Sequence, residues 1–186
     1  PFLAGPFIHT AFYGGMNLSE NGSPEQKAEY LPRLARGELF FAYGLSEPNV
    51  GGDLASVETR AELDGDEVVV NGAKRWCTGA DWADVIYCLV RSGPADARYR
   101  NLSFLLIPTT TPGISMRGIA HANLRYTDSQ DVFFDNVRVP AENLVGTRGK
   151  GWDIAKYLLT HEREMIGDMG SPGRDSMHQI AKKAIG

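Results

Sequence analysis

Cysteine is scarce in this 186-residue chain, which contains only Cys77 and Cys88. Two cysteines cannot build the disulfide framework on which small secreted domains rely, so that class of protein is excluded. Both lie in segments patterned like strands, and reduced cysteines packed inside a cytoplasmic protein are the favoured interpretation. No apolar run approaches the roughly 20 residues needed to cross a bilayer, so no membrane span is expected.

A strong charge of one sign is also missing. The net charge is −4, and the lysines and arginines form no long stripe, so no nucleic-acid partner is expected. The four histidines show no spacing typical of metal ligands, so no metal site is expected. The remaining composition, 42% hydrophobic and 23% charged, is that of a globular protein with one good-sized core.

Helical patterning occupies the two ends of the chain, and short strands occupy the middle. Residues 23–26 form a helix start with a serine cap and a proline, and Pro32 is expected to interrupt that helix. A tight turn is predicted at Asn71-Gly72, and a second helix from Trp152 to about Ile166, broken by glycines at 167 and 170. Strands are predicted over residues 56–63, 67–70, 74–78, 85–91, 102–107 and 132–137. The predicted fold class is therefore α+β, an antiparallel β-barrel or sandwich flanked by helices.

The most informative stretch is residues 41–53, FAYGLSEPNVGGD. An apolar run is stopped at Pro48, which lacks a backbone donor. Gly51 and Gly52 then allow the main chain to turn sharply and to approach a ligand closely. A hydroxyl and free N–H groups at such a corner suit a flat cofactor that carries phosphates. Taken alone, the stretch still favours an ordinary glycine turn over a binding site.

A second motif, residues 71–78 (NGAKRWCT), changes that balance. Together with residues 46–53 (SEPNVGGD), it resembles the middle domain of the acyl-CoA dehydrogenases. That family has a Thr/Ser-Glu-Pro-x-x-Gly-Ser-Asp-type turn followed by an Asn-Gly-x-Lys-x-Trp-x-Thr-type strand at about this separation. Residues 30–38 and 132–146 supply two further matches, and all four follow the order of the family.

The resemblance implies a longer parent protein. Residues 1–40 would be the end of an N-terminal helical domain, and residues 41–140 the middle β domain. Residues 141–186 would be a linker and the start of a C-terminal helical bundle. The true N-terminus, with any targeting segment, would then lie outside this chain.

FAD is the cofactor that the resemblance implies. An indole can lie along the flavin ring and exclude water, hydroxyls can bond the polar edge of the ring, and glycine N–H groups can meet the pyrophosphate. Outside this motif Trp76 would be interpreted as a core aromatic. The implied contacts come from Tyr43, Leu45, Ser46, Gly51, Gly52, Trp76 and Thr78.

Gly52 departs from the family pattern, because most relatives have serine at this position. The missing hydroxyl removes one hydrogen bond to phosphate or acyl-CoA, a loss of about 1–3 kcal/mol in a dry site. Cys77 and Gly79 also differ from the commoner isoleucine and asparagine.

Glu162 interrupts the apolar stripe of its own helix. Its helical neighbours Leu158, Leu159, Met165 and Ile166 are all apolar, and none of them can form an ion pair with it. Such a carboxylate loses hydration, so its pKa should rise, as a general base requires. On position alone, a salt bridge from another segment or a water-exposed helix edge is the favoured alternative.

The resemblance shifts that balance toward catalysis. Most acyl-CoA dehydrogenases take their base from the C-terminal bundle, but a minority carry it on the first helix of that bundle, directly before an arginine. His161-Glu162-Arg163 matches the minority arrangement, so Glu162 is predicted to be the base. Arg163 is expected to support acyl-CoA binding, and Thr160 and Gly52 to contact substrate. An interdomain or surface ion pair is the alternative for Arg163.

The implied reaction is α,β-desaturation of an acyl-CoA thioester, in which a glutamate removes the α-proton and a hydride passes to FAD. An electron-transferring flavoprotein would be the electron acceptor, and a homo- or hetero-oligomer in the cytoplasm is expected. One alternative is an acyl-CoA oxidase or flavin monooxygenase of the same fold. The other is a non-catalytic subunit or binding module, which the glycine at position 52 mildly favours.

Overall fold

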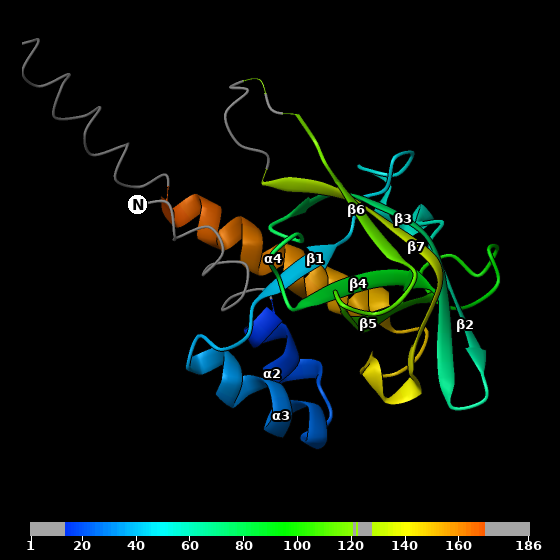
Figure 1. Cartoon of the computed structure of the whole chain (residues 1–186), viewed down its shortest axis with the longest axis horizontal. Helices are drawn as coiled ribbons and strands as arrows, with labels where there is room; N and C mark the ends of the chain where they lie inside the picture. The colour runs from blue at the N-terminus through cyan, green and yellow to red at the C-terminus, as the bar shows by residue number, and fades with distance from the viewer. Residues whose placement is uncertain (1–13, 121, 123–127, 170–186) are drawn as a thin grey trace, which may run out of the picture.

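Helices flank one eight-stranded sheet in the computed structural model, which describes residues 14–120, 122 and 128–169 (Figure 1). The chain order is α2 (Asn17–Asn21), α3 (Pro24–Ala35), β1 (Phe41–Gly44), β2 (Arg60–Asp64), β3 (Glu67–Thr78), β4 (Val85–Arg91), β5 (Leu102–Pro108), β6 (Ile114–Gly118), β7 (Ser129–Pro140), β8 (Leu144–Val145) and α4 (Gly151–Met169). In Figure 1, α4 crosses behind β1 and β4, and α2 and α3 lie together beside them.

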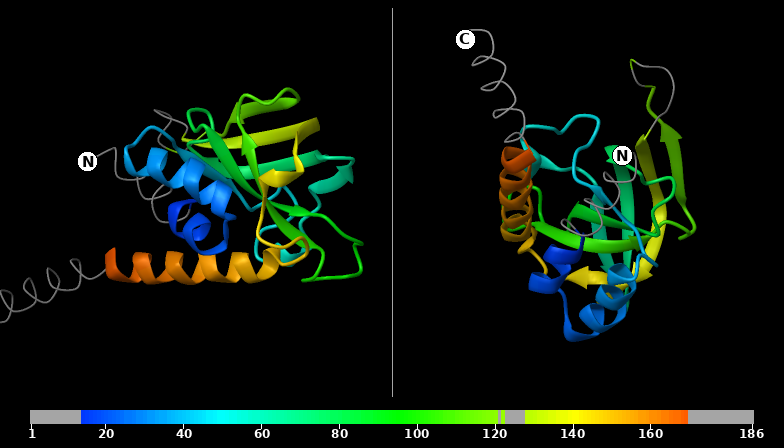
Figure 2. Two further views of the ribbon diagram at one scale, coloured as in Figure 1. Left: turned by 90° about the horizontal axis from the view of Figure 1, so that it is seen from below. Right: turned by 90° about the vertical axis from the view of Figure 1, so that its left-hand side faces the viewer.

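The sheet is open and strongly curved (Figure 2). Its strand order is β6-β7-β3-β2-β4-β5-β8, and β1 pairs with β4 outside this path. Most neighbours are antiparallel, but β1 and β2 both run parallel to β4, and β2 joins β4 only through Arg60 and Arg91. The predicted α+β fold class is confirmed, with the sandwich rather than the closed barrel as its form.

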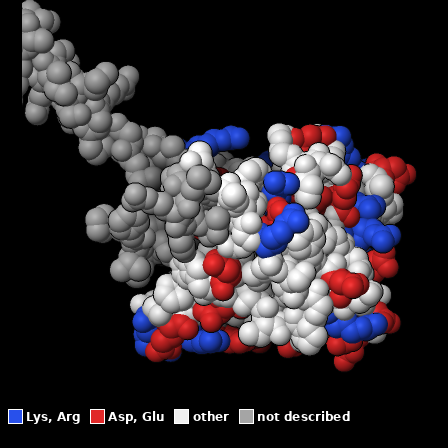
Figure 3. All heavy atoms as spheres, turned by 45° about the horizontal axis from the view of Figure 1, so that its top comes forward, with Lys and Arg blue, Asp and Glu red and all other residues white. Residues whose placement is uncertain are grey.

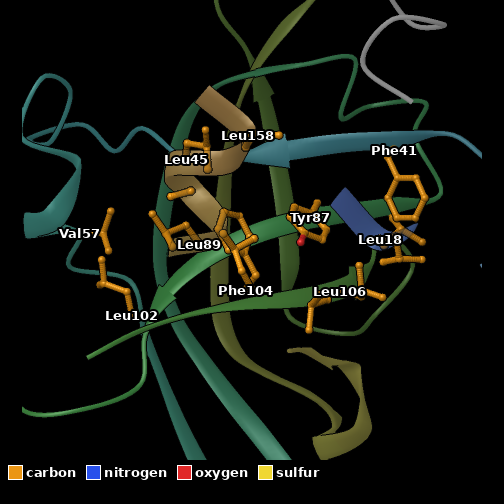
Figure 4. Packing of buried hydrophobic residues seen from close by; sticks show 14 of the residues in the cluster. Leu18, Phe41, Leu45, Val57, Tyr87, Leu89, Leu102, Phe104, Leu106 and Leu158 are labelled. Carbon is orange, nitrogen blue, oxygen red and sulfur yellow. The ribbon is translucent and has the colours of Figure 1, made fainter. Parts of the chain in front are cut away.

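The core consists of two layers that share β4 and β5. Side chains alternate across a strand, so a strand buried on both faces supplies two cores. Tyr87 and Phe104 stack at a ring separation of 4.6 Å in the layer beneath the helices, shown in Figure 4. Cys88 and Leu105 face the other layer, which β3 and β7 close. The long apolar runs that predicted these strands reflect this double burial.

Helix α3 begins as the sequence predicts, with Ser23 and Gln26 in a reciprocal capping box. The prediction that Pro32 interrupts the helix is wrong, because α3 continues to Ala35. Leu31 and Leu34, on either side of the proline, pack against the core beneath the helices. This packing offsets the single backbone hydrogen bond that the proline removes.

Asn71-Gly72 is not a hairpin turn, which corrects a second prediction. Strand β3 passes through it without a break, and the register with β7 shifts at this point. Gly72 has φ 146°, and a Cβ there would lie 2.7 Å from Thr59. The glycine therefore serves a bulge and a close approach rather than a chain reversal.

Other elements also differ from the predicted ones. Residues 54–56 form a 3₁₀ turn, so the strand predicted from residue 56 begins at Arg60. Strand β6 has weak patterning and was missed. Helix α4 passes through Gly167 to Met169 because a single glycine costs a helix only about 1 kcal/mol. The predicted break at Gly170 lies outside the described residues.

Within the described ranges, no helix has the length and apolarity needed to span a bilayer, and no group of side chains could hold a metal ion. Cys77 and Cys88 are both free and buried. On the face shown in Figure 3, basic and acidic side chains are intermixed.

Candidate active site

A β-bulge in β3 presents Trp76. The register with β7 shifts between Lys74 and Cys77, so that Arg75 and Trp76 together lie opposite Asp131. Trp76 adopts φ 62°, a left-handed conformation that is uncommon for a bulky residue. Trp76 is 56% exposed, whereas Lys74 and Cys77, which lie at the two ends of the bulge, are buried. The bulge therefore turns the indole out of the sheet instead of into the core.

The corner that follows β1 lies beside this bulge. The Arg75 backbone N–H donates to the Ser46 carbonyl at 2.8 Å, which joins the two motifs directly. A small turn follows, in which Glu47 and Val50 exchange backbone hydrogen bonds. The chain then reaches Gly51 and Gly52, and a Cβ at either glycine would meet nothing within 4 Å.

The two motifs line a common cavity of about 300 Å³ with one face of α4. Leu159 and Glu162 are three residues apart, so they lie on the same face of the helix and both reach the cavity. The lining residues are Tyr43, Leu45, Ser46, Gly51, Gly52, Leu54, Arg75, Trp76, Leu159 and Glu162.

Glu162 is partly buried, and in the described part of the chain its carboxylate makes no hydrogen bond or ion pair. Burial raises its pKa, and the neighbouring Arg163 opposes the rise. Earlier turns of α4 fix its place, because Ile154, Ala155 and Leu158 are buried beneath the sheet. The carboxyl thus enters the cavity from a helix that is anchored in the core.

Six of the seven predicted cofactor residues line the cavity together with the predicted base. Thr78 does not; it lies at the end of β3. Thr160 and Arg163 are exposed and lie outside the lining, and the Thr160 hydroxyl donates to the Lys156 carbonyl on its own helix.

Three residues that support the cavity received no role from the sequence. Glu47 and Lys74 form an ion pair at 2.8 Å, with side chains 3% and 0% exposed. Lys74 also donates to the Leu45 carbonyl, and the backbone N–H groups of Glu58 and Thr59 donate to Glu47. Arg75, the third, places its guanidinium 5.0 Å from the centre of the Trp76 ring. The glutamate and lysine belong to the two motifs, so their pairing could have been inferred from the motifs.

Comparison with known proteins identifies the family. Residues 42–137 match the model of the acyl-CoA dehydrogenase middle domain. The chain belongs to the acyl-CoA dehydrogenase family. Members of this family depend on FAD. The predicted resemblance is therefore confirmed.

Individual acyl-CoA dehydrogenases agree with this assignment. The chain is 40% identical to acyl-CoA dehydrogenase FadE29 of Mycobacterium tuberculosis over 84% of its own length and 40% of that protein. The Tcur3481–Tcur3483 steroid acyl-CoA dehydrogenase superposes with a TM-score of 0.79 at 36% identity, covering 85% of this chain and 40% of that one. The ChsE4–ChsE5 complex of M. tuberculosis superposes with a TM-score of 0.77 at 37% identity, covering 84% of this chain and 40% of that one. The chain thus spans about two-fifths of the length of these relatives.

The cavity has features that fit a flavin. An exposed indole offers a flat apolar wall, and the open space at the glycine corner lets the backbone approach a phosphate. Its size falls at the lower end of small-molecule sites, which are about 300–1,000 Å³.

Proposed function

We propose that the parent protein is an FAD-dependent acyl-CoA dehydrogenase that introduces a double bond between the α and β carbons of an acyl-CoA thioester. The observation that carries the proposal is the shared cavity. It joins the glycine corner, the Trp76 indole and the Glu162 carboxyl, which come from three separate segments. Family membership supplies the reaction type.

Glu162 is the proposed general base. A partly desolvated carboxylate without a hydrogen-bonded partner is a stronger base than one in water, and removal of a proton next to a thioester carbonyl needs that strength. Leu159 and Leu54 line the same cavity, and their hydrophobic side chains would limit the access of water. Bound FAD supplies the ability to accept the β-hydrogen with its electron pair.

The cofactor would be held by the lining residues of the two motifs. Trp76 would cover the flavin ring, Tyr43, Leu45 and Ser46 would lie along it, and the Gly51 and Gly52 N–H groups would bind phosphate, since all six residues line the cavity. Thr78 keeps its predicted role as a hydroxyl donor at the end of β3. Thr160 and Arg163, exposed on α4 next to the base, would contact acyl-CoA as it enters, and Gly52 would contact it through its backbone.

The domain plan and the partners belong to the same proposal. Residues 1–40 would end an N-terminal helical domain, residues 41–140 would form the β domain, and residues 141–186 would be a linker and the start of a C-terminal helical bundle. An electron-transferring flavoprotein would accept the electrons. The relatives named as pairs of proteins support a homo- or hetero-oligomer. A cytoplasmic location stays a prediction, in keeping with two free buried cysteines.

The test is acyl-CoA-dependent bleaching of the flavin absorbance in the full-length protein, with Glu162→Gln as the variant. We expect Glu162→Gln to bind FAD normally and to bleach at least a hundredfold more slowly, the effect of removing a general base. Glu58→Gln is the matched control, because Glu58 lies outside the cavity lining. Bleaching of Glu162→Gln at the wild-type rate would reject Glu162 as the base and place the base elsewhere in the parent protein.

The alternatives give different results in the same assay. An oxidase would recover its colour with oxygen as sole acceptor and release peroxide. A non-catalytic subunit or binding module would purify in full length without flavin absorbance.

A further inference from the structure

We infer that Arg75 places a positive charge beside the flavin ring and makes bound FAD easier to reduce. The inference rests on the proposed function, and it assigns a role to a residue that neither motif explains. Apart from Glu162, Arg75 is the one charged residue in the described lining of the cavity.

Three contacts fix the position of Arg75. Its backbone N–H is bonded to Ser46, and its guanidinium lies over the Trp76 ring. Its Nε lies 3.7 Å from Oδ1 of Asp131, a carboxylate that is almost fully buried in β7. That oxygen is buried without a hydrogen bond, so its charge is available to hold the guanidinium. The side chain of Arg75 remains 36% exposed, on the side that opens to the cavity.

Asp131 does not cancel the charge of Arg75. Its second oxygen, Oδ2, lies 3.0 Å from Arg117, so one carboxylate serves two guanidinium groups. Glu162 lines the same cavity, but among the described residues it forms no ion pair with Arg75. The group of two arginines and one aspartate therefore carries a net positive charge next to the indole.

A cation at this place acts on the redox equilibrium of the cofactor. Reduction adds an electron pair to the isoalloxazine, and a nearby positive charge favours the more electron-rich form. The effect is strongest where water is excluded, because the effective dielectric constant is then low. The Arg75 guanidinium carbon lies 5.0 Å from the centre of the Trp76 ring, the ring proposed to cover the flavin, so its charge would stand near the isoalloxazine.

The test is the midpoint potential of FAD in the full-length protein, measured by equilibration with a reference dye. At fixed dye potential, Arg75→Met should lower the ratio of reduced to oxidised flavin about tenfold, which is about 30 mV for a two-electron couple. Arg75→Lys keeps the charge and should stay within threefold of wild type. Both variants keep the backbone bond to Ser46, so FAD content and the thermal midpoint should change little.

Arg117→Met is the matched control. Arg117 shares Asp131 but is 72% exposed and lies outside the cavity lining, so its loss should shift the ratio less than twofold. A wild-type ratio in Arg75→Met with full FAD content would overturn the inference while leaving the proposed function intact. An equal shift in Arg117→Met would also overturn it, because the effect would then come from Asp131. A wild-type protein that binds no FAD would overturn both.

Discussion

The Nζ of Lys74 lies 2.8 Å from Oε1 of Glu47, and the two side chains are almost completely buried. Glu47 belongs to the corner after β1 and Lys74 to the strand that carries Trp76, so the pair joins the two halves of the cavity wall. The lysine also donates a hydrogen bond to the carbonyl of Leu45, two residues before Glu47. The ion pair therefore fixes the spacing between the proposed phosphate and ring contacts of the flavin.

Lys74→Met should be strongly destabilising. It leaves the Glu47 carboxylate buried with only two backbone donors, and breaking a buried pair from one side costs about 3–5 kcal/mol. Urea unfolding of the full-length protein measures the loss. Arg138→Met is the control, because Arg138 pairs with Asp64 and Glu67 at the surface and should cost less than about 1 kcal/mol. An equal decrease in the free energy of unfolding in the two variants would show that the buried pair contributes no more to stability than the surface pair.

Acid should weaken the fold through Glu47. Burial raises the pKa of this carboxyl, but Lys74 and the hydrogen bonds to Thr59 and Glu58 outweigh it and leave the pKa below its ordinary value of 4.5. Its stabilising contribution is complete above that value and disappears as the pH falls through the lower folded-state pKa. Urea midpoints between pH 6 and pH 3 should therefore fall more steeply for wild type than for Glu47→Gln. Parallel curves would contradict the prediction.

The pH dependence of flavin bleaching should report Glu162. Its pKa is raised by burial, and the charge of Arg163 limits the rise. The base works only when deprotonated, so the acidic limb of the rate profile should lie above pH 4.5. Arg163→Gln should move this limb to higher pH, and Arg163→Lys should not. A move to lower pH in the glutamine variant would show that Arg163 does not act on Glu162 by its charge.

Gly52→Ser should be tolerated by the fold and should strengthen ligand binding. The backbone at Gly52 is not left-handed, and open space surrounds its Cβ position, so the free energy of unfolding should change by less than about 0.5 kcal/mol. A new hydroxyl at this corner can add one hydrogen bond, worth about 0.5–1.5 kcal/mol, to the binding of FAD or acyl-CoA. Equilibrium titration of the apoprotein and unfolding in urea check the two parts.

Gly72→Ala is the contrasting variant. Its Cβ would clash with Thr59 at 2.7 Å, and its φ of 146° disfavours a side chain, so it should lose more than about 1 kcal/mol. Equal tolerance of the two substitutions would contradict the role assigned to the bulge.

Local chemistry made much of this fold predictable from sequence. The capping box of α3 is complete within residues 23–26, and the doubly buried β4 and β5 reveal themselves as apolar runs. The wrong predictions concern positions where contacts with residues far away in the sequence determine the local structure. Asn71-Gly72 has the local chemistry of a hairpin, but pairing with β7 and the close approach of Thr59 extend the strand through it.

The candidate site also contains residues that the sequence identified and one that it did not. The family motifs grouped Ser46, Gly52 and Trp76, and these three residues line one cavity with Glu162. Helical periodicity marked Glu162 as a carboxylate on an apolar stripe, but only the resemblance of residues 161–163 to the family favoured it as the base. The role inferred for Arg75 could not be predicted from the sequence, because it depends on a bulge and on Asp131, which lies 56 residues later in the chain. Thr160 matches a position that often contacts substrate in relatives of this family, and its contact with acyl-CoA stays a prediction; in the structure its hydroxyl donates to the Lys156 carbonyl of its own helix.

Helix α4 serves both as part of the core and as the carrier of the carboxyl. Ile154 and Leu158 are buried in the core beneath the sheet, and Glu162 lies one turn after Leu158 on the same continuous helix. A larger or smaller side chain at either of these two positions would shift helix α4 and would displace the Glu162 carboxylate relative to the Trp76 indole. Natural variation in the hydrophobic interior of this family should therefore leave a signature in turnover, even where every residue that touches the ligand is identical.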